Sequence, residues 1–192
     1  MDQKAILDIL KDSEALLSGH FELRSGLHSD RYFQCANVLR YPRRAAKLCD
    51  ELVAKVRNAG KGEFKVDGVI SPAMGGIIVG HEVARALGDV KHIFAEKQDG
   101  KLVMRRFQMA KGERYVVAED VITRGGRVQE TIDIVEAAGA TVAAVLVLVD
   151  RSGGKASFKY PTYSLLQIEP VTYEPGQCPL CATGSKSVHP GS

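Results

Sequence analysis

The sequence predicts an α/β fold in which a mostly parallel five-stranded sheet is flanked by helices. From residue 66 onward, short apolar runs of strand length alternate with segments of helical periodicity, which is typical of βαβ units. These runs are almost continuously apolar, as expected for strands that are buried on both faces. Glycine-rich or polar loops follow three of the runs, at residues 71–76, 119–127 and 150–154, and parallel sheets bind ligands at that end of their strands.

The individual elements follow in order along the chain. Helical periodicity marks residues 3–17 and, after Pro42, residues 43–58. Between these helices, "GHFELRSGLHSDRYFQ" alternates polar and aromatic residues, which indicates short strands or loops. The five strands are expected at residues 66–70, 92–96, 115–120, 142–150 and 163–168. Further helices are expected over residues 77–88 and from the turn near residue 125 to Gly139.

Composition limits the class of protein. A chain of 192 residues with 45% hydrophobic and 26% charged residues is ordinary for one globular domain. The net charge of +3 argues against general nucleic-acid binding. No run approaches the roughly 18 apolar residues of a membrane span. The amphipathic start "MDQKAILDILKDSEALL" does not resemble a signal peptide, so a cytoplasmic protein is expected.

Four cysteines are present, and only the "CPLC" pair Cys178 and Cys181 has the spacing of metal ligands. With His189 this pair offers three ligands, whereas a structural zinc site needs four. Redox chemistry is disfavoured because the pair lies among proline and glycine residues instead of at the start of a helix after a strand. The sequence therefore favours a reduced tail without a metal. The remaining histidines are interpreted as surface or packing residues, among them His20, His28 and His81.

The turn in "VVAEDVITRGGRVQE" has the composition of a phosphate-binding loop. Gly125 and Gly126 allow successive backbone N–H groups to face one concavity, the next helix adds its positive end, and Thr123 adds a hydroxyl. The lysine and serine or threonine that end a P-loop are absent, and no strict G-x-G-x-x-G motif occurs. A phosphate group that does not belong to a P-loop or dinucleotide site is therefore expected here.

Glu119 and Asp120 directly precede that turn. Two carboxylates would repel a bare anion, but they bind hydroxyl groups or a hydrated Mg²⁺ well. A phosphorylated sugar satisfies both parts of the motif, because its phosphate can occupy the loop while its hydroxyls contact the acids.

These residues resemble a known family. "VVAEDVITRGG" is similar to the phosphoribosyl-pyrophosphate (PRPP) motif of type I phosphoribosyltransferases. Over essentially the whole chain, "GHFELRSGLHSDRYFQ", "SPAMGGI", "FAEKQDGKLVMRR" and "DRSGG" resemble the orotate phosphoribosyltransferases. The resemblance implies that orotate and PRPP give orotidine 5′-monophosphate and pyrophosphate with Mg²⁺, in pyrimidine biosynthesis. It also implies the type I phosphoribosyltransferase fold, with a core of about residues 43–155 and a small hood of about residues 1–40 and 160–192.

The resemblance also implies roles for individual residues. Lys97 and Asp120 are the expected catalytic residues, and the magnesium is expected to bind mainly through PRPP, with no direct protein ligand. A loop of residues 97–110 would complete the neighbouring site of a homodimer, with added positive charge from Lys101, Arg105 and Arg106. Orotate would contact Tyr32, Phe33, Thr123 and Arg151. PRPP would contact Arg24, Met74, Gly75, Lys97, Glu119, Asp120, Val121, Ile122, Thr123, Arg124, Gly125, Gly126 and Arg127.

Several alternatives stay open at this point. A purine phosphoribosyltransferase is disfavoured because a neutral purine offers Arg151 no carboxylate, and a PRPP-sensing nucleic-acid-binding regulator is disfavoured by the mild charge. Arg151 could instead cap a strand end, Tyr32 and Phe33 could be core residues, and Lys97 could be a surface lysine. Arg124 is expected to point outward, whereas the sequence leaves the direction of Arg127 undecided.

Overall fold

The computed structural model describes residues 1–23, 25–60, 63–169 and 171–190, so Arg24 lies outside the described residues. Its larger sheet has six strands in the order β5-β4-β3-β6-β7-β8. All neighbouring strands pair in parallel except β4 and β5, which are antiparallel. The strands are β3 (Gly68–Pro72), β4 (Lys91–Gln98), β5 (Lys101–Val103), β6 (Arg114–Ile122), β7 (Thr141–Asp150) and β8 (Thr162–Gln167).

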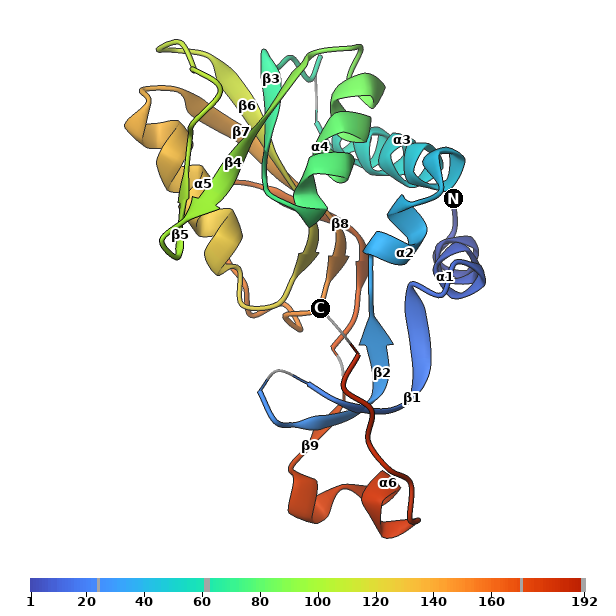
Figure 1. The fold of residues 1–192 in the computed structure, drawn as a ribbon. Helices are drawn as coiled ribbons and strands as arrows, with labels where there is room; N and C mark the ends of the chain where they lie inside the picture. The colour runs from blue at the N-terminus through green and yellow to red at the C-terminus, as the bar shows by residue number, and fades with distance from the viewer. Residues whose placement is uncertain (24, 61–62, 170, 191–192) are drawn as a thin grey trace.

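Helices cover both faces of this sheet, as Figure 1 shows. Helices α3 (Pro42–Ala59) and α4 (Gly75–Ala86) lie on one face, and α5 (Gly126–Ala137) lies on the other. Successive residues of a strand point to opposite faces, so the apolar strands contribute to two cores. Val116 and Leu146 belong to the core under α3 and α4, whereas Val117 and Val145 belong to the core under α5. This arrangement confirms the α/β fold.

A second, smaller lobe lies below the carboxyl ends of the parallel strands (Figure 1). It contains an antiparallel sheet in the order β1-β2-β9, formed by β1 (Leu16–Glu22), β2 (His28–Phe33) and β9 (Thr172–Tyr173). The C-terminal segment adds the short helices η1 (Pro175–Gln177) and α6 (Pro179–Ala182). Helices α1 (Gln3–Asp12) and α2 (Ala36–Leu39) lie beside the two lobes.

Three features of the fold differ from the sequence expectation. The first helix ends at Asp12 and not at residue 17, because Glu14 takes a left-handed φ of 56° and the N–H of Ala15 donates to the carbonyl of Leu10 at 2.8 Å. The large sheet has a sixth strand, β5. Strand β8 pairs with β7 and buries Leu166, so the C-terminal segment of the small lobe starts after Gln167 and not near residue 160.

The extra strand arises from the basic segment after β4. Asp99 and Gly100 have φ values of 48° and 87°, as the two central residues of a type I′ turn require. This turn reverses the chain and pairs Lys97 with Leu102. The N–H of Leu102 donates to Glu130 of α5 at 3.1 Å, which holds the hairpin against the sheet's edge. Within the described ranges, no helix is long and apolar enough to cross a membrane.

Candidate active site

The acid pair lies at the carboxyl end of β6, between the two lobes. Glu119 is buried and Asp120 is half-buried. Each carboxylate accepts a backbone hydrogen bond, Glu119 from the N–H of Asp120 (3.1 Å) and Asp120 from the N–H of Val121 (2.8 Å). Burial, followed by the charge of Asp120, raises the pKa of Glu119 well above its usual range, and burial also raises the pKa of Asp120. The pair is therefore short of compensating positive charge or hydrogen-bond donors.

The N-terminus of α4 packs directly on these carboxylates. A Cβ atom on Gly75 would lie 2.5 Å from Oδ2 of Asp120, and one on Gly76 would lie 3.1 Å from Oε1 of Glu119. Only residues without a side chain allow this approach. It brings the β3–α4 loop, in which Met74 is 81% exposed, to the same place as the acid pair.

The β6–α5 loop forms the next wall of the site. Gly125 takes a left-handed φ of 80° at the start of α5, and its backbone lies so close to Phe158 that a Cβ would be 2.8 Å from the ring. Thr123 and Gly126 are exposed here, whereas the Ile122 side chain is in the core, which leaves only its backbone for a ligand. The loop thus presents backbone groups and a hydroxyl at a helix N-terminus, as phosphate binding requires.

The two arginines of this loop behave differently. Arg127 reaches across to the β3–α4 loop, where its Nη1 donates to the carbonyl of Ala73 at 3.1 Å. Its charge also lowers the pKa values of Glu119 and Asp120, against the larger effect of burial. Arg124 is exposed. Arg127 therefore connects two loops that the family resemblance predicts to contact PRPP.

Arg151 follows β7 at the same edge of the sheet. Its guanidinium lies 5.5 Å from the centre of the Phe33 ring, in a cation–π arrangement. Its Nε is buried and has no hydrogen-bond partner among the described residues. Burial lowers the pKa of Arg151, although nearby Cys35 and Tyr32 oppose this change. A buried donor without a partner costs free energy, so this guanidinium is suited to an acceptor from a ligand.

Strand β2 and the residues after it connect the small lobe to this site. Phe33 is 5% exposed and belongs to the main core as well as facing Arg151, while Tyr32 packs on Phe21 with ring centres 5.8 Å apart. The thiol of Cys35 contacts the carbonyl of Asp120 at 3.8 Å. Burial, followed by the charge of Asp120, raises the pKa of Cys35 well above its usual range. Sequence reasoning missed Cys35, because no local pattern links it to a strand 85 residues later.

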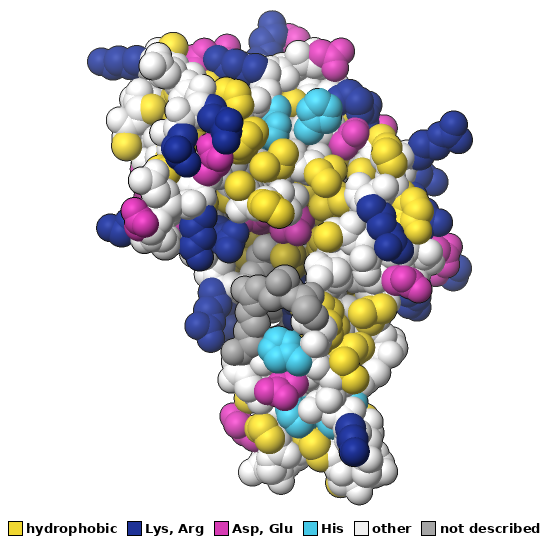
Figure 2. Space-filling model, viewed as in Figure 1, with side chains coloured by type: hydrophobic (Ala, Val, Ile, Leu, Met, Phe, Trp, Pro, Cys, Tyr) yellow, Lys and Arg dark blue, Asp and Glu magenta, His cyan; other side chains and the backbone are white. Residues whose placement is uncertain are grey.

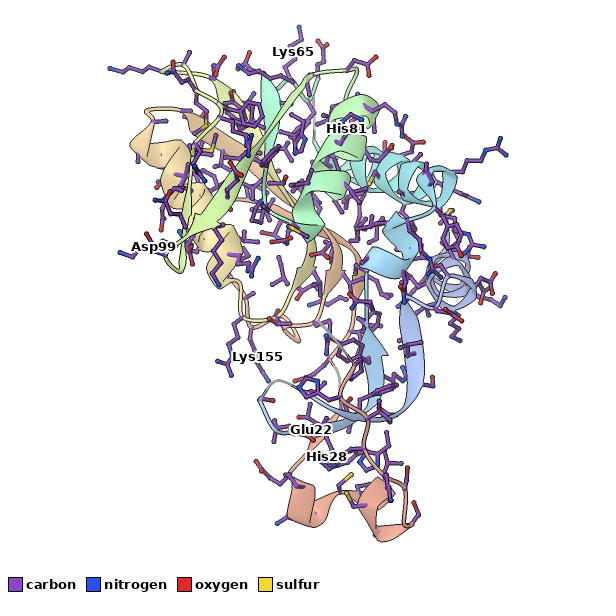
Figure 3. All side chains as sticks on the ribbon, viewed as in Figure 1. Glu22, His28, Lys65, His81, Asp99 and Lys155 are labelled. Carbon is purple, nitrogen blue, oxygen red and sulfur yellow. The ribbon has the colours of Figure 1, made fainter. Side chains whose placement is uncertain are left out.

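The cations of the β4–β5 hairpin lie at the edge of the sheet. Lys97, Lys101 and Arg105 are exposed, whereas Arg106 pairs with Glu96 through two hydrogen bonds of 2.9 and 3.2 Å. Figure 2 shows lysine and arginine side chains gathered on the left of the constriction between the lobes, and acidic side chains just above it. Figure 3 shows Asp99 at the tip of the hairpin, on that same side. Arg106 is exposed as well, but within this chain it already pairs with Glu96.

The structure therefore assembles the predicted residues of three loops and of β2. Gly76 joins the predicted Gly75, and its signal was the glycine pair in "SPAMGG".

The C-terminal tail differs from the sequence expectation. His189 is exposed, with its Nδ1 near the carbonyl of Pro190, whereas Cys178 is buried against His20. The expectation of a reduced tail without a metal did not take into account that the fold places His20 and His28 beside Cys178 and Cys181.

Comparison with known proteins agrees with this geometry. Residues 37–181 match the family described as the phosphoribosyl transferase domain. The chain is 50% identical to an orotate phosphoribosyltransferase of Desulforamulus reducens, over 100% of this chain and 98% of the relative.

Solved structures share the fold. The crystal structure of orotate phosphoribosyltransferase from Aeropyrum pernix matches with a TM-score of 0.71 and 26% identity, over 85% of this chain and 94% of that one. An adenine phosphoribosyltransferase from Rhodothermus marinus matches with a TM-score of 0.66 and 20% identity, over 86% of this chain and 100% of that one. The fold is thus common to proteins named for different bases. The domain match and the full-length identity to the Desulforamulus relative are more specific, and they show that this chain belongs to the orotate phosphoribosyltransferase family.

Proposed function

We propose that this protein transfers the 5-phosphoribosyl group of PRPP to orotate, giving orotidine 5′-monophosphate and pyrophosphate for pyrimidine (UMP) synthesis. The observation that carries the choice of orotate is the guanidinium of Arg151, which faces Phe33 and has a buried Nε without a partner in the described part of the chain. Orotate offers a planar ring and a carboxylate, and a guanidinium pairs with carboxylates through parallel N–H groups. A neutral purine would offer no carboxylate to this half-buried guanidinium.

The proposed PRPP site consists of the acid pair, the loop that follows it and the start of α4. The ribose hydroxyls would donate to Glu119 and Asp120, whose pKa values burial raises, and these hydrogen bonds would offset part of the cost of burying the two carboxylates. The 5′-phosphate would bind the backbone N–H groups of residues 121–127 at the start of α5. The pyrophosphate would lie against Met74 and Gly75 at the N-terminus of α4, where the helix dipole favours negative charge.

The reaction itself needs little proton transfer. The bond between the ribose C1 and the pyrophosphate oxygen breaks, a ring nitrogen of the orotate anion forms the new bond, and the electron pair of the broken bond leaves with pyrophosphate. Positive charge develops on the ribose in between, next to the carboxylates of Glu119 and Asp120. Catalysis would therefore depend on electrostatic stabilisation by fixed groups, and on exclusion of water from the ribosyl cation.

Magnesium is the proposed cofactor, held mainly through PRPP. The donor chemistry of the site fits a hydrated Mg²⁺, because Glu119 and Asp120 are hard oxygen donors whose burial outweighs the nearby charge of Arg127. When bound, the ion would offset negative charge on the leaving pyrophosphate. The chain's own contribution is to fix the ribose hydroxyls and to keep the carboxylates in place through the N–H groups of Asp120 and Val121.

We further propose a cytoplasmic homodimer in which the hairpin of residues 97–110 completes the partner's site. The four cysteines are free, which suits a reducing compartment. Lys97 is exposed at the base of the hairpin, so it can reach a neighbouring molecule. A mixing experiment tests this arrangement. Lys97→Ala and Asp120→Asn should each be inactive. An equimolar mixture of the two should recover about a quarter of wild-type activity after subunit exchange, because about half of the dimers are then mixed and each mixed dimer has one intact site of two. No recovery after verified subunit exchange would contradict the shared site.

The reaction is tested by following the ultraviolet absorbance of orotate with PRPP and Mg²⁺. Orotate should be consumed only when both are present, and Asp120→Asn should lose most of this activity while keeping the wild-type circular dichroism spectrum. Turnover of guanine or hypoxanthine in place of orotate would favour a purine enzyme. PRPP binding without turnover of any base would favour a regulator.

A further inference from the structure

A cluster of two histidines and two cysteines lies in the small lobe, away from the proposed PRPP site. His20 is on β1, His28 is on β2, and Cys178 and Cys181 flank the start of α6. The cysteines are at least 150 residues from the histidines along the chain, so only the fold brings the four together. In Figure 3, His28 lies just above α6, beside side-chain sulfur atoms.

The ligand atoms of these four side chains surround one point. All of them lie within 4.8 Å of one another. Nε2 of His20 is 3.5 Å from Sγ of Cys178 and 3.7 Å from Sγ of Cys181, and Nδ1 of His28 is 3.3 Å from Sγ of Cys181. Ligand atoms on one tetrahedral zinc lie about 3.3 to 3.8 Å apart, given Zn–N and Zn–S bonds of about 2.0 to 2.3 Å. The three nitrogen–sulfur distances fall in this range, and the two nitrogens, 2.8 Å apart, would separate slightly.

We propose that His20, His28, Cys178 and Cys181 bind one zinc ion, which fastens the C-terminal segment to the β1–β2 hairpin. The proposal does not depend on the reaction proposed above. Four protein ligands complete a tetrahedral coordination shell and leave no position for water or substrate, which is the property of a structural zinc site. Two thiolates also balance the charge of Zn²⁺, which suits a site where three of the four ligand residues are buried.

The surroundings already orient the ligands. Nδ1 of His20 lies 3.0 Å from the carbonyl of Ser185, to which it donates its proton, and this leaves the lone pair of Nε2 directed at the cluster. The tail also hydrogen-bonds to β1 through Val188, which follows both cysteines in the sequence. The N–H of Val188 donates to the carbonyl of His20, and the N–H of Glu22 donates to the carbonyl of Val188, both at 2.9 Å. The hydrogen bond from Nδ1 of His20 to Ser185 is of the kind that histidine ligands of zinc usually make with their second ring nitrogen, and it fixes the ring.

Other uses of the four residues fit less well. A two-iron cluster with two histidine and two cysteine ligands places the nitrogens on one iron and the sulfurs on the other, whereas these atoms converge on a single point. A disulfide between Cys178 and Cys181 would leave the two histidines facing each other without a role, and both cysteines are free.

The first test is metal analysis of protein prepared in zinc-containing medium, with Cys49→Ser as the matched control, because Cys49 is a free buried cysteine in α3, outside the cluster. Wild type and Cys49→Ser should each contain about one zinc per chain, whereas Cys178→Ser and Cys181→Ser should contain little. Replacement by Co²⁺ should give the visible absorption of a tetrahedral site with two sulfur ligands. Zinc-free wild type, zinc retained in both cluster variants, or a mass two hydrogens lower, which indicates a disulfide, would each overturn the proposal.

A second test uses only the wild-type chain, so it does not depend on how the variants fold. Removal of the metal by a chelator with a thiol reagent should lower Tm and open the tail to protease cleavage. Zinc added after the thiols are restored should reverse both effects, and Mg²⁺ should not. A Tm and cleavage pattern that stay the same through removal and return of the metal would contradict a structural site.

Discussion

The close approach of α4 to the acid pair makes Gly75→Ala an informative perturbation. The added Cβ would lie 2.5 Å from Oδ2, 2.8 Å from Cγ and 3.1 Å from Oδ1 of Asp120, and real Cβ atoms essentially never come within 3.0 Å of another atom. The carboxylate cannot simply move aside, because its Oδ1 accepts a hydrogen bond from the N–H of Val121 at 2.8 Å. Either Asp120 rotates and loses that bond, or the start of α4 shifts.

The magnitudes predict that both stability and activity fall by measurable amounts. An off-rotamer side chain costs about 0.5 to 1.5 kcal/mol, and a hydrogen bond to a charged group contributes about 1.5 to 3 kcal/mol. Replacing glycine in a helix returns about 1 kcal/mol, so the net loss of stability is roughly 1 to 3.5 kcal/mol. This corresponds to a fall in Tm of about 2 to 14 °C for a domain of this size. A reacting group displaced by about 1 Å costs about 100-fold in rate, so kcat/KM should fall by about that factor.

Both quantities are measured on the same preparation, Tm by thermal denaturation and kcat/KM by orotate consumption. Gly176→Ala is the control, because a Cβ there meets nothing within 4 Å, and both values should stay at the wild-type level. In an Asp120→Ala background the clash is absent, so Gly75→Ala should no longer lower Tm. Wild-type kcat/KM in Gly75→Ala, or the same fall in Tm in both backgrounds, would refute the reasoning.

Three further predictions concern the other charged groups. Arg151→Met should raise the KM for orotate by about 100-fold or more with little change in the KM for PRPP, because a buried carboxylate would lose its charged partner; equal changes in both constants in steady-state kinetics would argue against a direct contact. Arg127→Ser removes the hydrogen bond to Ala73 and should raise the KM for PRPP by about 10-fold. Arg124→Ser is the control and should raise this KM less. Unchanged PRPP affinity in Arg127→Ser would rule out phosphate contact by Arg127. Since the folded state raises the pKa of Glu119, the stability associated with its protonated form is present below about pH 4 and is lost as pH rises toward the raised pKa. The Tm of Glu119→Gln should therefore fall less than that of wild type between about pH 5 and 9, and parallel curves would contradict the assigned burial effect.

Local patterns explain why much of the fold and part of the site were predictable. The β6–loop–α5 unit is contiguous in sequence, so an apolar run, two acids and a glycine pair specify strand, ligand loop and helix together. The carboxyl ends of parallel strands meet at one edge, which brought Gly75, Asp120 and Arg151 to the same region. The hairpin turn at Asp99 and Gly100 had the usual dipeptide signal, although the sequence did not establish that β5 joins the sheet.

The remaining features depend on contacts between distant segments. The direction of Arg127 depends on the position of the β3–α4 loop, whose Ala73 carbonyl accepts its hydrogen bond. Likewise, the glycine pair Gly75 and Gly76 does not by itself reveal that carboxylates fill the space beside it. The sequence offered the tail cysteines too few partners for a metal site. His20 and His28 lie on β1 and β2, far from the cysteines in sequence, so only the folded structure brings the four residues together. In the proposed dimer, the exposed Lys97 acts in the site of the neighbouring chain, which no pattern within one chain identifies.

The most direct measurement of the central claim is a competition between bases. The protein is given equal amounts of orotate and adenine with Mg²⁺ and a limiting amount of PRPP, and the nucleotides formed are separated by chromatography. If Arg151 selects a carboxylated ring, orotidine 5′-monophosphate should account for nearly all the PRPP consumed, and this preference should fall sharply in Arg151→Met. Formation of adenosine monophosphate as the main product would contradict the proposed function.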